Sequence, residues 1–244
     1  MISKLGIFDS GVGGLTVAKS IYQAKLFDEI IYFGDTARVP YGSKNESTII
    51  RYSLEALEFL KNFDINFMIT ACNSVSSCAL PELNKEANFE VVGVIEAGID
   101  AVKKVANIND NILIIGTKTT INSNLYQEVL KNLGYKNIIA LPTPLFVPLV
   151  AEEVYDNGVL NEIFRLYFSN LKKIDVVVLG CTHFPMLSWY LQNYFKDAKL
   201  IHSGEAIVEL LKDRYKLTSK HTTNIQFLAS ENPNHLKEVA KKWF

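Results

Sequence analysis

The sequence lacks most of the features that mark a metal-binding, redox or nucleic-acid-binding protein. Among 244 residues there are only three cysteines, Cys72, Cys78 and Cys181, and they form no CxxC pair. This spacing argues against a zinc knuckle and against a thioredoxin-type site. Because 25 lysines and arginines are balanced by 26 aspartates and glutamates, we expect no nucleic-acid footprint and no polybasic membrane patch.

Long apolar runs are also missing. No run comes close to the ~20 residues that a membrane-spanning helix needs. The opening stretch, MISKLGIFDSG, has an apolar run that is short and soon meets Asp9, so it does not have the design of a signal peptide. We therefore expect a cytoplasmic protein, without a membrane partner, whose cysteines are thiols in a reducing compartment.

Nucleotide-binding motifs are absent as well. The glycine-rich stretch Phe8–Gly14, FDSGVGG, lies between an apolar run and a helical pattern, but it lacks the G-x-G-x-x-G spacing of a Rossmann loop, and there is no P-loop. Its glycines let backbone N–H groups approach an anion. We interpret it as a cradle for a carboxylate, beside the acidic side chain of Asp9.

What the chain does contain is an alternation of short apolar runs with longer helical patterns. Most of the runs are continuously apolar, as in strands that are covered on both faces. This alternation predicts an α/β protein with mainly parallel sheet. The expected strands are Lys4–Ser10, Glu29–Asp35, Phe67–Cys72, Glu90–Ile95, Asn111–Thr117, Asn137–Pro142, Val176–Cys181, Ala198–Ser203 and Asn224–Ser230.

The helical pattern that starts at Thr48 has apolar residues at intervals of three and four. It predicts a helix for which Ser47 or Thr48 supplies the N-cap.

The chain also shows a weak internal repeat. In each half, a strand ends in a polar turn, at Asp9–Ser10 and at Thr117, and roughly 60 residues later another strand ends in a cysteine. The two cysteines are Cys72 and Cys181. Since ligands of open α/β sheets bind beyond the carboxyl ends of the strands, we expect two related α/β units whose polar strand ends face one another.

Cys72 and Cys181 are the strongest candidates for chemistry. Each lies at the last position of a strand and is followed by hydroxyl or amide residues, whereas Cys78 lies in a run of small residues and is expected to be structural. Two opposed thiols could form a disulfide, bind a metal ion or carry out acid–base chemistry. The third is favoured, because one thiolate removes a proton from one face of a carbon and the opposite thiol returns a proton to the other face.

His183 follows Cys181 by two residues. On an extended segment such residues share a face, so His183 is expected to lie beside Cys181 and to tune it. His202, His221 and His235 have no such context, and no role is assigned to them. The end of the strand Glu29–Asp35 and the loop after it contain Asp35, Arg38, Tyr41 and Gly42, which could bind a polar ligand or only form a turn.

A series of motifs resembles those of the bacterial glutamate racemases in order and spacing over almost the whole chain. The motifs are GIFDSGVGGLTV, YFGDTARVPYG, ACNS, GVIEAG, GTKTTINSNLY, PLFVPLV and LGCTHFP. The resemblance implies two pseudo-symmetric three-layer α/β domains with mainly parallel sheets and an active site in the cleft between them. By this resemblance one domain comprises residues 1–96 plus 207–244, and the other comprises residues 97–206.

The same resemblance implies a racemase that interconverts L- and D-glutamate without PLP or a metal, and that supplies D-glutamate for peptidoglycan and cell-wall biogenesis. It implies a homodimer. Cys72 and Cys181 would be the acid–base thiols, Cys72 acting on D-glutamate and Cys181 on L-glutamate, with Asp9 assisting Cys72 and His183 assisting Cys181. The residues implied to bind the substrate are Ser10, Pro40, Tyr41, Gly42, Asn73, Ser74, Thr117, Thr120 and Thr182.

The chain departs from the family pattern at three positions. Ser74 and Val75 replace the usual Thr and Ala after the first catalytic cysteine, which keeps the hydroxyl and adds bulk. Ala151 stands where the family commonly has a glutamate that is thought to set protonation in the site. On a helix Glu152 is rotated by about 100° from that position, so it is not expected to replace the missing carboxylate. We expect racemisation to persist with a lower rate or a changed pH dependence.

Three other interpretations remain open. The chain could racemise another acidic amino acid such as aspartate, since the sequence alone does not fix the side-chain pocket. It could be a catalytically weakened paralogue that binds glutamate without turning it over. A redox protein that bridges Cys72 and Cys181 is the third, although no resolving CxxC is present.

Overall fold

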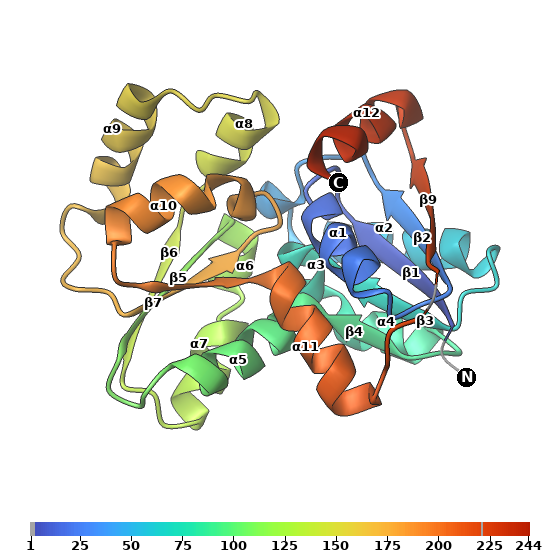
Figure 1. Cartoon of the computed structure of the whole chain (residues 1–244), viewed down its shortest axis with the longest axis horizontal. Coiled ribbons are helices and arrows are strands. Elements are labelled where there is room, and N and C mark those ends of the chain that lie inside the picture. The colour runs from blue at the N-terminus through green and yellow to red at the C-terminus, as the bar shows by residue number, and fades with distance from the viewer. Residues whose placement is uncertain (1–2, 221) are drawn as a thin grey trace.

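The computed structural model describes residues 3–220 and 222–244 and contains two parallel sheets that lie side by side (Figure 1). His221 lies outside the described residues. The strands are β1 (Lys4–Asp9), β2 (Glu29–Gly34), β3 (Phe67–Thr70), β4 (Val91–Gly93), β5 (Asn111–Gly116), β6 (Asn137–Pro142), β7 (Val176–Gly180), β8 (Lys199–His202) and β9 (Asn224–Ala229).

Helices connect and cover these strands. The α-helices are α1 (Leu15–Ala24), α2 (Glu46–Lys61), α3 (Asn73–Cys78), α4 (Leu80–Glu86), α5 (Val94–Val105), α6 (Lys118–Asn122), α7 (Leu125–Asn132), α8 (Phe146–Ala151), α9 (Asn157–Phe168), α10 (Ser188–Phe195), α11 (Ser203–Tyr215) and α12 (Pro233–Trp243). Two short 3₁₀ helices are η1 (Tyr41–Ser43) and η2 (Phe184–Leu187).

The strands of the first sheet are in the order β4-β3-β1-β2-β9, and those of the second are in the order β6-β5-β7-β8. Every strand pairing in both sheets is parallel. All the strands expected from the sequence are present, with ends that differ by at most two residues. The predicted α/β class with parallel sheet is therefore confirmed.

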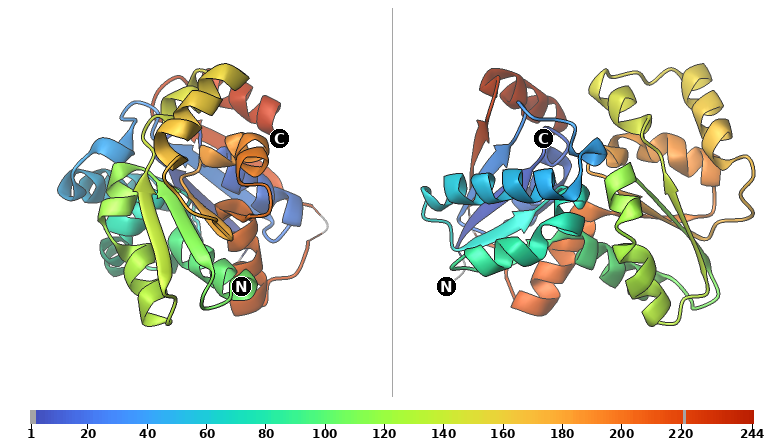
Figure 2. Two further views of the ribbon diagram at one scale, coloured as in Figure 1. Left: turned by 90° about the vertical axis from the view of Figure 1, so that its left-hand side faces the viewer. Right: turned by 180° about the vertical axis from the view of Figure 1, so that it is seen from behind.

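Each sheet is the middle of a three-layer sandwich. In β1, Leu5 and Ile7 pack with α1, α11 and α12, whereas Phe8 packs on the opposite face with α2 and α3. In β5, Ile115 faces α8 and α9, and Ile114 faces α5 and α7. Side chains alternate between the faces of a strand, so a strand that is covered on both faces needs a continuous apolar run. Figure 2 shows α2 lying along one face of the first sheet.

Helix α5 belongs to the cores of both sheets. Val94 and Ala97 pack in the core of the first sheet, whereas Ile95 and Ile99 pack in the core of the second. The strand expected over residues 90–95 is therefore too long, because it ends at Gly93 and α5 starts at the next residue. A helix that is buried on two sides has the same continuous apolar run as a buried strand, so periodicity alone did not separate them.

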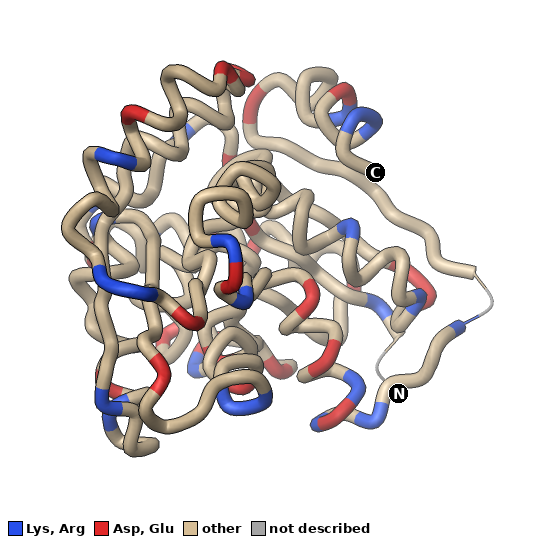
Figure 3. The backbone as a smooth tube through the Cα atoms, turned by 60° about the vertical axis from the view of Figure 1, so that its left-hand side comes forward, with Lys and Arg blue, Asp and Glu red and all other residues tan. Residues whose placement is uncertain are grey.

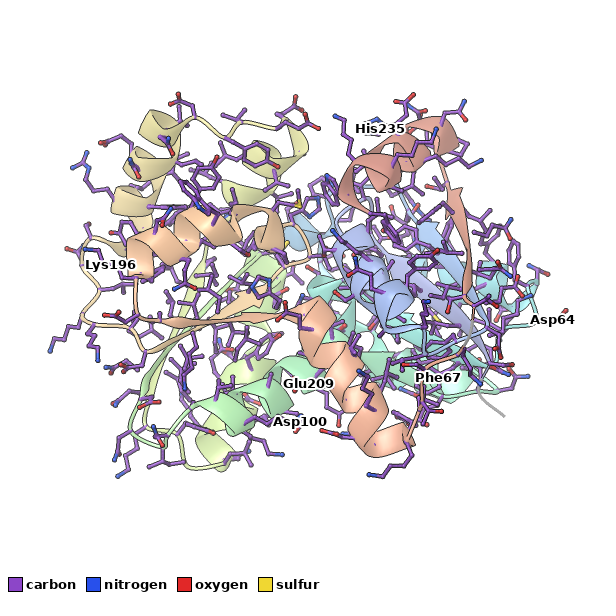
Figure 4. The ribbon with its side chains drawn as sticks, viewed as in Figure 1. Asp64, Phe67, Asp100, Lys196, Glu209 and His235 are labelled. Carbon is purple, nitrogen blue, oxygen red and sulfur yellow. The ribbon has the colours of Figure 1, made fainter. Side chains whose placement is uncertain are left out.

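Helices α5 and α11 pack against one another where the two sheets meet. Lys104 of α5 donates to Glu209 at 2.8 Å and to Asp213 at 2.7 Å, both on α11. Figure 4 labels Asp100 and Glu209 at this crossing. The domain boundaries expected from the resemblance, at residues 96 and 206, fall within these two helices and stay a prediction.

The N-cap expected for α2 is wrong. Asn45 caps the helix, and its side-chain oxygen accepts a hydrogen bond from the backbone N–H of Thr48 at 3.0 Å. Ser47 and Thr48 therefore lie inside the first turn. Asn45 fills the capping role expected of them, because an asparagine side chain also accepts a hydrogen bond from a free N–H group of the first turn. In the part of the chain that the structure describes, no helix has both the length and the apolar character to span a membrane. Acidic and basic residues are interspersed along the backbone (Figure 3).

Candidate active site

The candidate residues lie at the carboxyl ends of the central strands of both sheets. Asp9 is the last residue of β1, and Cys72 follows the neighbouring strand β3. Thr117 and Cys181 follow β5 and β7, whose last residues are paired with one another. The parallel registers therefore gather polar groups from distant parts of the chain along one edge of each sheet.

Cys72 is the residue directly before α3 and is only 6% exposed. Its Sγ lies 3.5 Å from Oγ of Ser10, to which the thiol donates. Burial, together with the charge of Asp9, raises the pKa of the Cys72 thiol to about 11, although the Ser10 hydroxyl and two backbone N–H groups of α3 act in the opposite direction. Cys72 is therefore a protonated thiol at neutral pH.

Cys181 occupies the matching position in the second sheet and is also 6% exposed. Its Sγ lies 3.9 Å from Nδ1 of His183. The pKa of Cys181 is raised, chiefly by burial and then by charge on Cys72 and on Asp9, while the backbone N–H of His183 lowers it. Thr182, which follows Cys181, hydrogen-bonds to Asp9 at the end of β1, so the two buried thiols lie in one region of the protein although they come from different sheets.

His183 lies beside Cys181, but not for the reason expected. The strand ends at Gly180, and the backbone of His183 is helical, with φ −79° and ψ −27°, so the segment is a turn and not an extended strand. The turn brings the imidazole back towards the sulfur. Burial lowers the pKa of His183 to about 4, so the imidazole is neutral near pH 7.

Asp9 is fully buried between the two halves of the site. Its Oδ2 accepts a hydrogen bond from the backbone N–H of Gly11 at 2.9 Å, and its Oδ1 accepts one from the Thr182 hydroxyl at 3.3 Å. Burial raises the pKa of Asp9, and these hydrogen bonds partly oppose that effect. Among the described residues no hydrogen bond joins Asp9 directly to Cys72, so the carboxyl acts on this thiol through its charge.

Hydroxyl groups from the two halves form a hydrogen-bonded cluster. Oγ of Ser74 lies 2.9 Å from Oγ1 of Thr117 and 3.4 Å from that of Thr120, and the two threonine oxygens are 3.1 Å apart. Gly42 packs against this cluster: a Cβ at Gly42 would lie 2.4 Å from Cβ of Thr117. Only glycine allows this approach, which places its backbone next to the hydroxyls.

Other predicted binding residues have side chains that are engaged elsewhere. The hydroxyl of Tyr41 donates to Asp35, and Pro40 is exposed. The Asn73 side chain accepts from Tyr126 at 3.1 Å and donates to Ser203 at 3.5 Å. The binding roles of Asn73 and of the Pro40–Gly42 turn stay predictions.

The structure also adds residues that sequence reasoning missed. The Thr16 hydroxyl lies 2.9 Å from the carbonyl oxygen of Thr182, and the Tyr126 hydroxyl and Ser203 hold Asn73. Thr16 and Tyr126 lie within ordinary amphipathic helices, and no spacing rule in the sequence distinguishes them from structural residues. Asp35, which the sequence did single out, is fully buried, and its Oδ1 has no hydrogen-bond partner among the described residues.

Two further residues considered in the sequence, Cys78 and Ala151, form no side-chain hydrogen bond with this cluster in the described chain. Cys78 contacts Ser77, its pKa is raised mainly by burial, and it has none of the site residues as a hydrogen-bond partner in the described chain. Ala151 is the exposed last residue of α8. No group of three or more His, Cys, Asp or Glu side chains within residues 3–220 and 222–244 is arranged to hold a metal ion.

The arrangement suits proton transfer at a carbon atom that is held between the halves. Each thiol has its own polar neighbour, Ser10 for Cys72 and His183 for Cys181, and Asp9 lies within electrostatic reach of both. Because both thiols are protonated and His183 is neutral at pH 7, these three groups add no negative charge that would repel an anionic ligand.

Comparison with known proteins gives a consistent result. The family model described as Asp/Glu/Hydantoin racemase matches residues 18–211. The chain is 53% identical over 243 residues to the glutamate racemase of a Nitratiruptor species, covering 98% of this chain and 96% of that protein. The crystal structure of glutamate racemase from Campylobacter jejuni subsp. jejuni superimposes with a TM-score of 0.96 at 51% identity, covering 98% of this chain and 97% of that one.

A more distant structure includes a ligand. Glutamate racemase from Francisella tularensis subsp. tularensis, in complex with D-glutamate, matches with a TM-score of 0.86 at 30% identity and covers 99% of this chain and 93% of that one.

Proposed function

The chain belongs to the Asp/Glu/hydantoin racemase family, and on that premise we propose that it is a glutamate racemase that interconverts L- and D-glutamate with two thiols and no cofactor. The observation that carries the proposal is the pairing of Cys72 and Cys181. They follow strands of separate parallel sheets, yet Thr182, the residue after Cys181, donates to Asp9 at the end of β1 at 3.3 Å, and both sulfurs are buried. The D-glutamate bound by the Francisella tularensis relative supports the choice of substrate.

The reaction needs two proton transfers on opposite faces of Cα. One cysteine, as the thiolate, takes the Cα proton, and the electron pair of the broken C–H bond is delocalised into the adjacent carboxylate. The other cysteine, as the thiol, then donates its proton to the opposite face and becomes a thiolate. We assign Cys181 to L-glutamate and Cys72 to D-glutamate. Each turnover exchanges the protonation states of the two sulfurs.

Because the pKa values of both thiols are high, the bound substrate itself helps to convert a thiol into the reactive thiolate. A bound glutamate brings an ammonium group into a buried site, where an opposite charge within about 4–6 Å favours the ionised form of a thiol. Its carboxylates lose little to repulsion, because both thiols are neutral before it binds. Thiolate thus forms mainly when the substrate is present.

Neighbouring groups prepare each thiol for proton transfer. His183, neutral at pH 7, lies 3.9 Å from Cys181 and accepts the proton that this thiol loses. Asp9, as the carboxylate, raises the pKa of Cys72 and so makes the Cys72 thiolate a stronger base. The substrate carboxylates are held by neutral donors. These are the hydroxyls of Ser10, Ser74, Thr117, Thr120 and Thr182 and the backbone groups of Tyr41, Gly42 and Asn73.

Substrate access requires the two sheets to move apart. Both cysteines are almost completely buried, and hydrogen bonds such as Ser74 to Thr117 join the two halves. Helices α5 and α11 pack together where the two sheets meet, and we assign them as the hinge about which the sheets separate. A glutamate that binds between the halves then stabilises the closed arrangement.

We extend the proposal to the setting of the reaction. D-glutamate formed by this chain supplies peptidoglycan synthesis and cell shape, the protein acts in the cytoplasm, and it works as a homodimer, as its family implies.

The test is a racemisation assay with a panel of amino acids, followed by circular dichroism. L- and D-glutamate should each approach the same equal mixture without added PLP or metal, and chelator should not slow them. Aspartate should turn over at a small fraction of that rate. If aspartate turned over faster than glutamate, aspartate would be the substrate. If glutamate bound without turnover, the chain would be the catalytically weakened paralogue.

A further inference from the structure

Thr16 joins the two halves of the site. It lies in the first turn of α1, directly after the glycine-rich stretch that follows β1. Its Oγ1 is 2.9 Å from the carbonyl oxygen of Gly13 and 2.9 Å from the carbonyl oxygen of Thr182, the residue that follows Cys181. One hydroxyl proton is thus shared between a local carbonyl and a carbonyl that belongs to the other sheet.

The surfaces around this hydrogen bond are in direct contact. A Cβ at Gly13 would lie 2.5 Å from Nδ1 of His183 and 2.5 Å from Oγ1 of Thr182. The backbone of Gly13 is therefore pressed against the turn that carries Cys181. Any displacement of this turn from α1 changes the distance between Cys181 and the groups of the first sheet.

The N-terminal end of α1 is itself firmly placed. Leu15 and Val17, on either side of Thr16, are fully buried in the core of the first sheet. One turn later Ser20 donates to the Thr16 carbonyl at 3.2 Å, and Gly204 of α11 packs against Ser20. Thr16 thus connects a fixed element of the Cys72 half to the backbone of the Cys181 turn.

We propose that Thr16 is a positioning residue for racemisation, which docks the Cys181–His183 turn on α1 and so sets the position of Cys181 relative to a substrate held near Cys72. This inference rests on the proposed glutamate racemase function. In such reactions a misplacement of about 1 Å can cost on the order of 10²-fold in rate. Loss of the hydroxyl should therefore impair mainly the proton transfer that Cys181 carries out.

A purely structural role for Thr16 makes a different prediction. The hydrogen bond to Gly13 spans three residues and could serve only to stabilise the start of α1. In that case a variant lowers the melting temperature and the fraction of folded protein, but each folded molecule reacts as before. Kinetic isotope effects separate the two roles, because they do not depend on how much of the protein is active.

The experiment compares Thr16→Val, which removes the hydroxyl and keeps the shape, with Thr16→Ser, which retains it. Ser20→Ala is the matched control, since it removes a hydroxyl from the same helix one turn after Thr16, where the hydroxyl bonds to the Thr16 carbonyl and not to Thr182. For each protein, kcat/KM and its primary isotope effect are measured with 2-deuterated L-glutamate and with 2-deuterated D-glutamate. Thr16→Ala gives the same readout should the valine variant fold poorly.

For Thr16→Val we expect kcat/KM to fall by about 10- to 100-fold. The isotope effect should rise for L-glutamate, from which Cys181 takes the deuteron, and fall for D-glutamate, for which reprotonation by Cys181 becomes slow. Thr16→Ser and Ser20→Ala should behave like wild type. Unchanged isotope effects in Thr16→Val, with or without a loss of activity, would overturn the positioning role. A wild-type protein that does not racemise glutamate would instead overturn the proposed function, and this inference with it.

Discussion

The Thr182 hydroxyl donates to Oδ1 of Asp9 at 3.3 Å, although Thr182 follows the second sheet and Asp9 ends a strand of the first. Thr182 is the neighbour of one thiol, and Asp9 is the carboxyl that acts on the other. The hydrogen bond therefore makes the pKa of Asp9, in the first half of the site, depend on a hydroxyl from the second half. The site is complete only when the two sheets are together.

Removing either of the two proposed acid–base sulfurs should nearly abolish the reaction. We expect Cys72→Ser and Cys181→Ser each to lower kcat by at least ~10²–10⁴-fold, because a serine hydroxyl is a far weaker acid–base group than a thiol. Cys78→Ser, which removes a sulfur outside the cluster, should retain nearly full activity. Racemisation followed by circular dichroism measures all three. A well-folded Cys78→Ser variant that is as inactive as the other two would refute the assignment.

Thr182→Val should move the pH dependence of catalysis. The Thr182 hydroxyl lowers the pKa of Asp9, so its removal raises that pKa further. Asp9 then ionises at a higher pH, and the acid limb of the profile of kcat/KM against pH should shift to higher pH. Thr182→Ser keeps the donor and should keep the wild-type limb. If the limb stays in place in Thr182→Val, the protonation state of Asp9 does not control the reaction.

His183 should make the folded state less stable in acid. Its pKa is about 4 when folded and 6.5 ordinarily, so its contribution is fully present above about pH 6.5 and is lost as the pH falls towards 4. The loss amounts to about 3 kcal/mol of unfolding free energy. Urea denaturation of wild type and His183→Asn across this range measures it.

The comparison with His183→Asn isolates this single group. Other acids, including Asp9, titrate in both proteins, and their effects cancel in the difference. We expect wild type to lose its stability advantage over His183→Asn as the pH is lowered from 7 to 4. An advantage that is the same at both pH values would show that His183 is not buried in its neutral form.

Ala151→Glu tests the departure from the family pattern. The position is the exposed last residue of α8, so a glutamate can be introduced there without burying a charge. We expect the variant to raise kcat or to change its pH dependence relative to wild type. Glu152→Gln controls for a change of charge at the neighbouring position. Activity no higher than that of wild type between about pH 6 and 9 would mean that the missing glutamate is compensated or irrelevant.

Much of the fold could be predicted because the strands are covered on both faces. A strand such as β5 is continuously apolar from Ile112 to Ile115, and the polar residue Thr117 marks where the chain leaves the core. The end of β4 could not be predicted, since α5 begins at Val94 and packs into both cores with the same kind of apolar run. The spacing of apolar residues indicates which side chains are buried. A strand and a short helix that are each buried on two sides have the same continuous apolar run, so the spacing does not separate them.

The candidate site could be predicted as far as it depends on strand ends. Cys72, Cys181 and Asp9 were identified from their positions after apolar runs, and the parallel registers bring them to facing edges. The links between the halves could not be foreseen, because Thr16 and Thr182 are far apart in sequence and meet only through the packing of the two sheets. The turn at His183 was also missed, since two-residue spacing predicts a shared face only on an extended backbone.

The most direct test of the central claim is exchange of the Cα proton in heavy water, followed by NMR, with L-glutamate and D-glutamate in turn. If Cys72 and Cys181 address opposite faces of one bound amino acid, each enantiomer should acquire deuterium at Cα as it converts to the other, and both reactions should end at the same equal mixture. Glutamate that binds but keeps its Cα proton, from either enantiomer, would contradict the account.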